Sequence, residues 1–155
     1  MASNSLAALL LAGILTGCAV SAATQSGDLP PAFAPGATNP AVIQANLGST
    51  VCVPGWTEIE RPLPSYTANL KRHQLVNMGL TGTIDYEEDH RVPLSSGGAP
   101  MDPRNLWPEL WSGPHGAHAK DAIELQVLRD LCSGRTTLAQ AQAFWMGNFW
   151  TTTVP

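Results

Sequence analysis

Two adjacent residues near the middle of the chain, Asp89 and His90, carry side chains with complementary chemistry. A carboxylate is a hard oxygen ligand that suits Mg2+ or Ca2+, and a neutral imidazole accepts a proton from water near pH 7. Neighbouring side chains of an extended strand point to opposite faces, so the two groups can serve different tasks. Together they match the needs of phosphodiester hydrolysis, in which a cation holds the phosphate and a base activates the nucleophile.

The residues that follow this pair form a longer pattern. Arg91-Val92-Pro93 comes directly after His90, Gly97-Gly98 lies in the next segment, and Asn105-Leu106 begins about fifteen positions after His90. This pattern resembles the HNH endonucleases, also called the ββα-metal or His-Me finger group. Asp-His alone is common, so the resemblance depends on the combination of these motifs at this spacing.

Other segments are similar to a bacterial exported subgroup of these nucleases. They are Cys52 to Thr57, Asn105 to Pro108, Lys120-Asp121 with Glu124, and Leu131 to Gly134. The similarity covers about residues 39–150, which is nearly the whole predicted domain. It implies a monomeric, metal-dependent endonuclease that cuts DNA, with RNA as an alternative substrate, and that has little sequence preference.

The resemblance also implies roles for individual residues. His90 would be the general base, and Asp89 would bind one divalent cation, expected to be Mg2+ with Mn2+, Ni2+ or Zn2+ as alternatives. Asn105 would hold the loop and orient His90 from the second strand. The third metal ligand belongs on the following helix, where His118 is the preferred candidate and His115 the alternative; neither lies at the family's usual spacing from Asn105.

Other charged residues near the pattern have simpler interpretations. Arg91 and Arg104 are candidates to contact the substrate phosphate, although Arg91 stands where the family has an apolar residue and fits an exposed strand position equally well. Glu87 and Glu88 would repel a polyanion, so their side chains are expected to point away from the site. Lys120, Asp121 and Glu124 are expected to form surface ion pairs, because they lie at helical spacing. The alternative for Glu124 is a position beside the metal.

The charge balance limits how nucleic acid can be bound. Twelve Asp and Glu against eight Lys and Arg give a formal net charge of −4. Proteins that grip nucleic acid over a broad face are normally basic, so no extended electrostatic surface is expected. Phosphate chemistry here therefore requires a local site and a bound cation. The mean hydropathy of −0.01 excludes a multi-span membrane protein.

The N-terminus carries an export signal. Residues 6–20 form an apolar run with the length of a signal-peptide core, too short for a stable membrane span. Leu15-Thr16-Gly17-Cys18 resembles the bacterial lipoprotein signal, which implies cleavage before Cys18 and lipidation of its thiol, although Met1 to Ser5 lacks the usual positive charge. The alternative is ordinary cleavage near Ala22 and free secretion. We therefore expect an exported protein, held at the cell envelope only by a lipid anchor or else secreted.

The domain boundaries follow from composition. Residues 1–22 read as the signal segment, residues 23–38 as a tether rich in Pro and Ala, and residues 39–155 as the nuclease-like domain. Cys52 and Cys132 then remain in an exported chain and are expected to form a disulfide, with two free buried thiols as the alternative. A zinc site is disfavoured, because no Cys-x-x-Cys pair exists.

The pattern of apolar residues predicts the order of elements. It indicates helices over residues 66–78 and 118–131 and a last helix after Thr136 or Thr137, with short strands at residues 83–90 and 105–110 around a loop at residues 91–104. Tyr66, Leu70 and Val76 could supply an apolar face to the first of these helices, and the last helix carries Leu138, Ala141, Phe144 and Trp145. The fold class is α+β, with a small ββα-metal finger of two short antiparallel strands and a helix, plus additional packing helices.

Two other functions remain open at this point. The first is a catalytically inactive envelope lipoprotein or binding module that keeps the finger fold, which the imperfect third motif position favours. The second is a secreted antibacterial nuclease toxin, which would require a partner immunity protein that this chain alone does not reveal.

Overall fold

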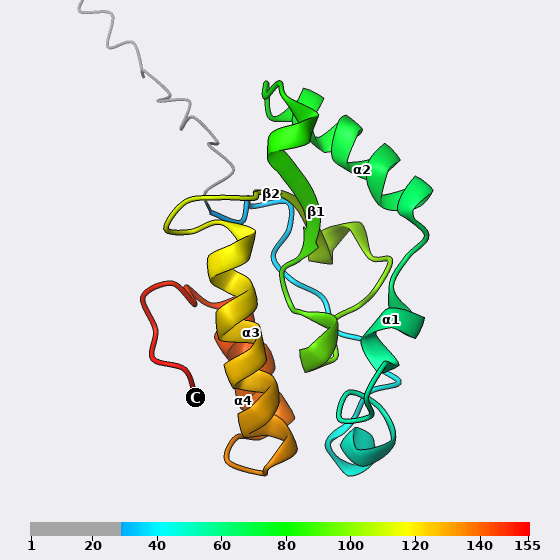
Figure 1. Cartoon of the computed structure of the whole chain (residues 1–155), viewed down its shortest axis with the longest axis vertical. Coiled ribbons are helices and arrows are strands. Elements are labelled where there is room, and N and C mark those ends of the chain that lie inside the picture. Colours follow the sequence, from blue (N-terminus) through cyan, green and yellow to red (C-terminus); the bar gives the residue numbers. More distant parts are fainter. Residues whose placement is uncertain (1–28) are drawn as a thin grey trace, which may run out of the picture.

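A computed structural model describes residues 29–155 (Figure 1). The predicted signal segment, the lipidation of Cys18 and the first part of the tether lie outside the described residues. The elements, in chain order, are α1 (Trp56–Glu60), α2 (Pro64–Asn77), β1 (Tyr86–His90), β2 (Leu106–Leu110), α3 (Ala117–Cys132) and α4 (Leu138–Met146). Short 3-10 helices lie at Gln44–Ser49, Thr83–Asp85, Leu94–Ser96 and Pro103–Asn105. The α+β class is thereby confirmed. Among residues 29–155, no helix combines the length and apolar character needed to cross a bilayer.

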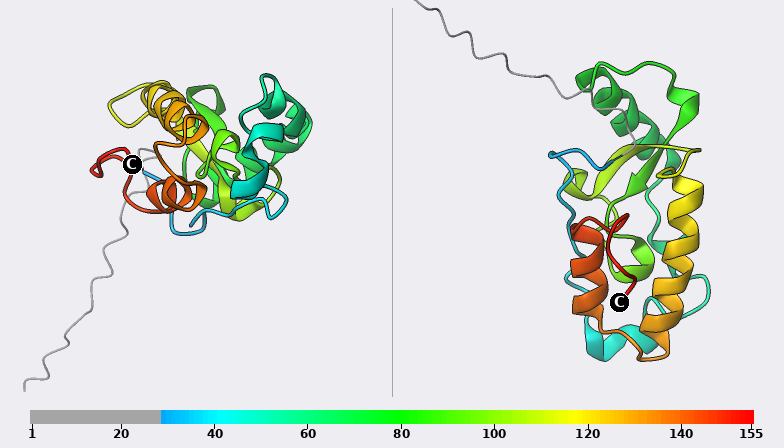
Figure 2. Two further views of the ribbon diagram at one scale, coloured as in Figure 1. Left: turned by 90° about the horizontal axis from the view of Figure 1, so that it is seen from below. Right: turned by 90° about the vertical axis from the view of Figure 1, so that its left-hand side faces the viewer.

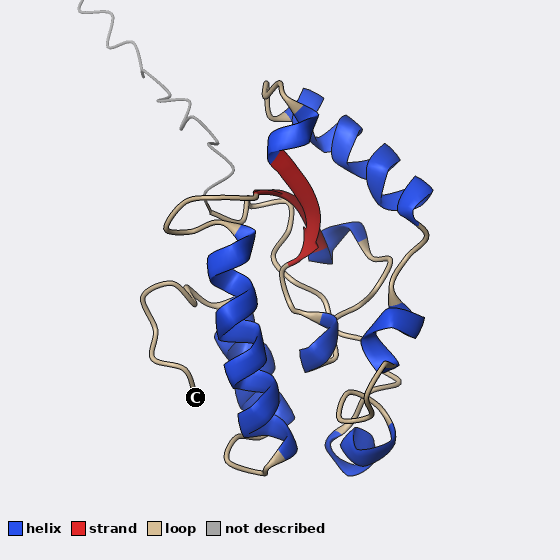
Figure 3. Cartoon of the chain, in the orientation of Figure 1, coloured by secondary structure: helices blue, strands red, loops and turns tan. Residues whose placement is uncertain are grey.

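The sheet consists of two antiparallel strands, the only ones among the described residues (Figure 3). In its register Asp89 lies opposite Trp107, and His90 lies opposite Leu106. Helix α2 is tied to the sheet by Lys71 Nζ, which donates to the Tyr86 carbonyl at 2.6 Å. Side chains alternate along β1, so those on the opposite face of the strand can contact α3.

Helix α2 agrees with the prediction in its position but not in its buried face. It begins with Pro64 at its first turn, where a proline costs no hydrogen bond, and Gly79 follows its end with a φ of +69°. Val76, predicted to be apolar core, is 72% exposed, whereas Gln74 and Leu75 are buried. The reason is a tertiary contact: Gln74 Nε2 donates to the Leu106 carbonyl at 3.0 Å, which turns that side of α2 toward β2.

Helices α3 and α4 lie side by side and antiparallel (Figure 2). The four apolar residues placed on the last helix are buried, and Thr137 caps this helix in a capping box with Gln140. A buried cluster joins α3, α4 and the loop after β1, and its members are Val92, Val127, Ala141, Phe144, Trp145 and Phe149. Trp145 Nε1 donates to Ser96 Oγ at 3.0 Å, which fixes that loop on α4.

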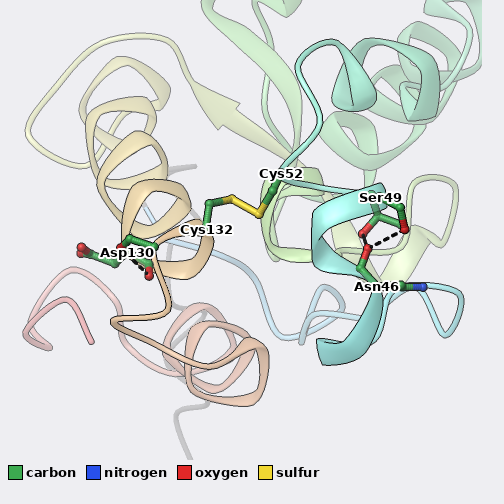
Figure 4. The surroundings of a disulfide bond; sticks show 7 residues. Asn46, Ser49, Cys52, Asp130 and Cys132 are labelled. Carbon is green, nitrogen blue, oxygen red and sulfur yellow. Dashed lines mark hydrogen bonds between the residues drawn. A yellow bond between two sulfur atoms is a disulfide. The ribbon is translucent and has the colours of Figure 1, made fainter.

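The predicted disulfide joins Cys52 to Cys132 (Figure 4). It connects the segment before α1 to the last residue of α3. A second apolar cluster lies beside it, formed by Val42, Leu47, Val51, Leu131 and Leu138. The covalent bond and this cluster together hold the N-terminal part of the domain against the end of the α3–α4 pair.

Replacing both Cys52 and Cys132 by Ser should lower the free energy of unfolding by about 4 kcal/mol in the chain-entropy model. The bond spans a sequence separation of 80 residues, so its loss increases the entropy of the unfolded chain. Urea denaturation followed by tryptophan fluorescence measures the change. Wild-type protein treated with a reductant should show the same loss, and an unchanged midpoint would contradict the prediction.

Candidate active site

Asp89 and His90 line one cavity of about 210 Å3. The cavity lies where the end of β1 meets α1, α3 and the 3-10 helix after β1. Its other lining residues are Thr57 and Arg61 from the α1 side, Leu94 and Ser95 from the loop, and Asp121, Glu124, Leu125 and Leu128 from α3. The two groups at the centre of the sequence pattern therefore face a common space, together with one guanidinium and two further carboxyl groups.

The His90 ring is held in one orientation by the backbone. The residue is 6% exposed, and its Nε2 lies 3.0 Å from the Pro100 carbonyl oxygen. A carbonyl can only accept, so Nε2 carries the proton and Nδ1 is left with a free lone pair. No hydrogen bond to Nδ1 is formed within residues 29–155.

Burial is the main influence on the charge of His90, and it lowers the pKa of the imidazole. The Asp89 carboxylate and the Pro100 carbonyl act in the opposite direction, without reversing the shift. The ring is therefore neutral at pH 7, the form in which it can accept a proton.

Asn105 fastens the loop between the two strands. Its side chain is fully buried and makes four hydrogen bonds. Oδ1 accepts from the backbone N–H groups of Val92 (2.8 Å) and Ala37 (3.2 Å), and Nδ2 donates to the carbonyls of Val92 and Ala99, both at 3.0 Å. Because Ala99 directly precedes Pro100, this anchoring also places the carbonyl that holds His90. Asn105 is thus placed to act as a positioning residue.

The Gly97-Gly98 pair of the sequence pattern has a steric cause. A Cβ at Gly98 would lie 1.8 Å from the Val92 carbonyl oxygen, an impossible approach for any side chain. Gly97 has a φ of +71°, in the left-handed region that favours glycine. The pair therefore allows the loop to fold tightly back against the end of β1.

Lys120 lies at the centre of the charged residues, contrary to the expectation of a surface ion pair. Its side chain is 0% exposed, and Nζ lies 2.5 Å from both Asp89 Oδ2 and Glu124 Oε1 and 3.9 Å from Glu109 Oε2. Burial acts to raise the pKa of Asp89, but the Lys120 charge and hydrogen bonds to the carboxylate hold it well below its usual range. Burial likewise acts to lower the pKa of Lys120, but the surrounding carboxylates raise it.

Three carboxyl groups on the sheet face form a compact group. Oxygen atoms of Glu87, Asp89 and Glu109 lie within 4.8 Å of one another. Glu109 is fully buried, and neither of its carboxyl oxygens has a hydrogen-bond partner. Burial raises the pKa of Glu109 to about 10 and that of Glu87 to about 7. Glu87 therefore does not point away from the charged residues, in contrast to the expectation.

Glu88 occupies the other face of β1, as alternation requires. Burial raises its pKa to about 8, and the nearest opposing charge is Lys71 on α2. Both of its carboxyl oxygens are buried without a hydrogen-bond partner. Of the three consecutive acidic residues of β1, only Asp89 lines the cavity.

The structure does not bring the predicted third metal ligand to Asp89. His118 is exposed and its ring stacks on Trp111, with 5.6 Å between centroids, while His115 lies against Trp150. Neither histidine lines the cavity. Helix α3 begins at Ala117, so residue 118 lies in its first turn, whereas the two carboxyl groups of α3 that reach the cavity, Asp121 and Glu124, come about one and two turns later.

The two arginines predicted to contact phosphate lie outside the cavity. Arg91 donates to the carbonyls of Met146 (2.9 Å) and Gly147 (2.8 Å) at the end of α4, and Arg104 is exposed and paired with Asp102 at 2.6 Å. Neither lines the cavity, whereas Arg61 does. No motif in the sequence marks Arg61, because it reaches the site through the packing of α1 beside the loop after β1.

Comparison with protein-family models, with curated proteins and with solved structures found no match to this chain. The geometry of the cavity is therefore the basis for the functional argument.

Replacing Lys120 by Met should lower the free energy of unfolding by about 3–5 kcal/mol at pH 8, because buried carboxylates lose their counter-charge. The loss should shrink at pH 5, where protonation neutralises those carboxyl groups in the folded variant. Urea denaturation at the two pH values measures both effects.

The comparison variant is Lys71→Met, which removes the other lysine of the chain, one hydrogen bond to a carbonyl and the charge that faces Glu88. It should cost less than Lys120→Met, because only one carboxyl group loses its counter-charge. An equal loss for Lys120→Met at both pH values would contradict a charge-based role for Lys120.

Proposed function

We propose that this protein is a metal-dependent endonuclease that hydrolyses phosphodiester bonds of DNA with little sequence preference. The observation that carries the proposal is the cavity shared by Asp89 and His90, into which a neutral imidazole with an unpartnered Nδ1 can direct its lone pair. RNA contains the same phosphodiester linkage and is the alternative substrate.

His90 would act as the general base. Its Nδ1 would take a proton from a water molecule in the cavity as that water attacks phosphorus. The Pro100 carbonyl, which accepts the Nε2–H, keeps the ring in the required tautomer and stabilises the imidazolium that forms. The guanidinium of Arg61 lines the same cavity and would bind a phosphate oxygen.

The donor set fits a hard divalent cation. Asp89 is surrounded by carboxyl groups of two origins, Glu87 and Glu109 on the strands and Asp121 and Glu124 on α3. All are oxygen donors, which suit Mg2+ or Mn2+ better than Zn2+. When bound, the cation would supply positive charge to offset the charge that develops on the phosphate and the leaving oxygen. Glu109, a fully buried carboxyl without a hydrogen-bond partner, fits such a group.

The wider features of the chain support a low-specificity enzyme of the cell envelope. With a formal net charge of −4, it has few means of binding DNA over a large surface or of reading bases. The disulfide between Cys52 and Cys132 fits an oxidising compartment and thus export.

The second candidate function is an inactive envelope protein that keeps the fold for binding. The ion pair of Lys120 with Asp89 favours it, because the ammonium already occupies the carboxylate that a catalytic cation requires. Cleavage assays with added cations separate the two functions.

A plasmid-nicking assay with Mg2+ or Mn2+ should show cleavage by the wild type that EDTA abolishes. His90→Ala should fold normally and lose activity by at least ~100-fold, since a positioned base contributes about that factor. Asp89→Ala should lose activity together with cation affinity. Intact plasmid with every cation, or equal cleavage by His90→Ala, would count against the proposal.

The same assay tests the corrected phosphate contact. Arg61→Gln should raise KM and lower the cleavage rate at limiting DNA by about tenfold or more, because one charge-assisted contact to phosphate is lost. Arg104→Gln removes the same charge from an exposed position outside the cavity and should leave cleavage unchanged. Equal effects of the two substitutions would exclude a specific role for Arg61.

The acidic limb of the pH–rate profile should have its midpoint below pH 6.5. The pKa of His90 is lowered in the folded protein, so the imidazole stays neutral and active as the pH falls to the ordinary histidine value. Initial rates between pH 5 and pH 8 at a saturating cation concentration give the midpoint. A midpoint above pH 6.5 would mean that the base is another group.

A further inference from the structure

The sheet face beneath α3 holds more carboxyl groups than ammonium groups. Four carboxyl groups interact there with the single ammonium of Lys120, and they belong to Glu87, Asp89, Glu109 and Glu124. Asp89 and Glu124 each lie 2.5 Å from that ammonium. One fixed cation therefore serves the carboxylates nearest to it, and each remaining carboxyl group is either protonated or requires a further cation.

The strands place three of these groups together. Glu87 and Asp89 share a face of β1 because side chains alternate along a strand, and Glu109 lies directly opposite Glu87 in the register. Like charges at directly opposed positions destabilise a sheet. Oxygen atoms of all three lie within 4.8 Å of one another, which is the spacing of ligands around a common ion.

Glu109 is the second, separate observation. It is 0% exposed, and both of its oxygens lack a hydrogen-bond partner. Lys120 Nζ is 3.9 Å away and is taken up by two closer carboxylates. A buried carboxyl group directed at other acidic oxygens is stable either as the protonated acid or beside a further cation, and a bound cation would displace that proton.

We propose that Glu87, Asp89 and Glu109 together bind one divalent cation on this sheet face. This inference rests on the proposed function, because the three residues would be the ligands of the nuclease cation. The strands, rather than α3, then provide the ligand set. Glu124 is left out because it is not among the three carboxyl groups whose oxygen atoms lie within 4.8 Å of one another. Glu87 is only half-buried, so the cation can enter from solvent, and Asp89 links the site to the cavity.

The test is cation binding, measured independently of cleavage. Mn2+ affinity is determined by calorimetry, and Tb3+ serves as a luminescent probe. Trp107, which lies opposite Asp89 in the register, provides a nearby sensitiser. Wild-type protein should bind Mn2+ and give tryptophan-sensitised Tb3+ emission.

The variants are Glu109→Gln and Glu87→Gln, with Glu88→Gln as the matched control. Glu88 is also a buried, unpartnered carboxyl, but on the opposite face of the same strand. We expect at least a tenfold loss of Mn2+ affinity for each of the first two and a change of less than twofold for the control Glu88→Gln. Glu109→Gln should also raise the melting temperature without cation and lose the increase that Mn2+ gives the wild type.

Two results would overturn the site. One is the absence of Mn2+ and Tb3+ binding by the wild type at millimolar concentration, and the other is a loss of affinity in Glu124→Gln with none in Glu109→Gln. Plasmid nicking, measured in parallel, separates this outcome from the function. If the wild type nicks plasmid and Glu109→Gln keeps its Mn2+ affinity, the ligand set is rejected and the nuclease function stands. If the wild type binds Mn2+ tightly but does not nick plasmid, the site is supported and the nuclease function is rejected.

Discussion

The buried ammonium of Lys120 is the interaction on which the arrangement of the site depends. It holds Asp89 at the end of β1 and Glu124 on α3 at 2.5 Å each, and thereby fixes the helix over an acidic sheet face. Without that charge, the carboxylates of the two elements would repel each other at close range. The position of α3, and with it one wall of the cavity, follows from a single ion whose side chain is completely enclosed.

Backbone groups, rather than other side chains, orient the candidate base. Asn105 binds the loop at Val92 and Ala99, and the next carbonyl along the chain, that of Pro100, accepts from His90. The tight return of the loop requires the glycine at position 98. The residues that form the sequence pattern are thus connected physically, since each one either contacts the imidazole or fixes the segment that does.

The sequence predicts features that depend on local spacing and fails where distant packing decides. Helices α2, α3 and α4 and the two strands follow from periodicity and terminator residues, and the disulfide follows from two remaining cysteines, whereas α1 was not predicted. The burial of Lys120 could not be predicted, because lysine is rarely enclosed and its carboxylate partners come from three different elements. Arg61 was missed, and His118 was preferred, for the same reason: the rotation of a helix about its axis is set by tertiary contacts, as the exposure of Val76 on α2 also illustrates.

The disulfide has a consequence for the width of the cavity. Cys52 precedes the helix whose end carries Arg61, and Cys132 terminates the helix that carries Glu124. Within residues 29–155 no hydrogen bond or ion pair joins α1 to α3, so the opening between guanidinium and carboxylate is spanned by one covalent link and apolar packing. A chain whose two cysteines are still reduced therefore lacks the covalent link between these walls, and the width of the cavity becomes fixed only after the cysteines are oxidised.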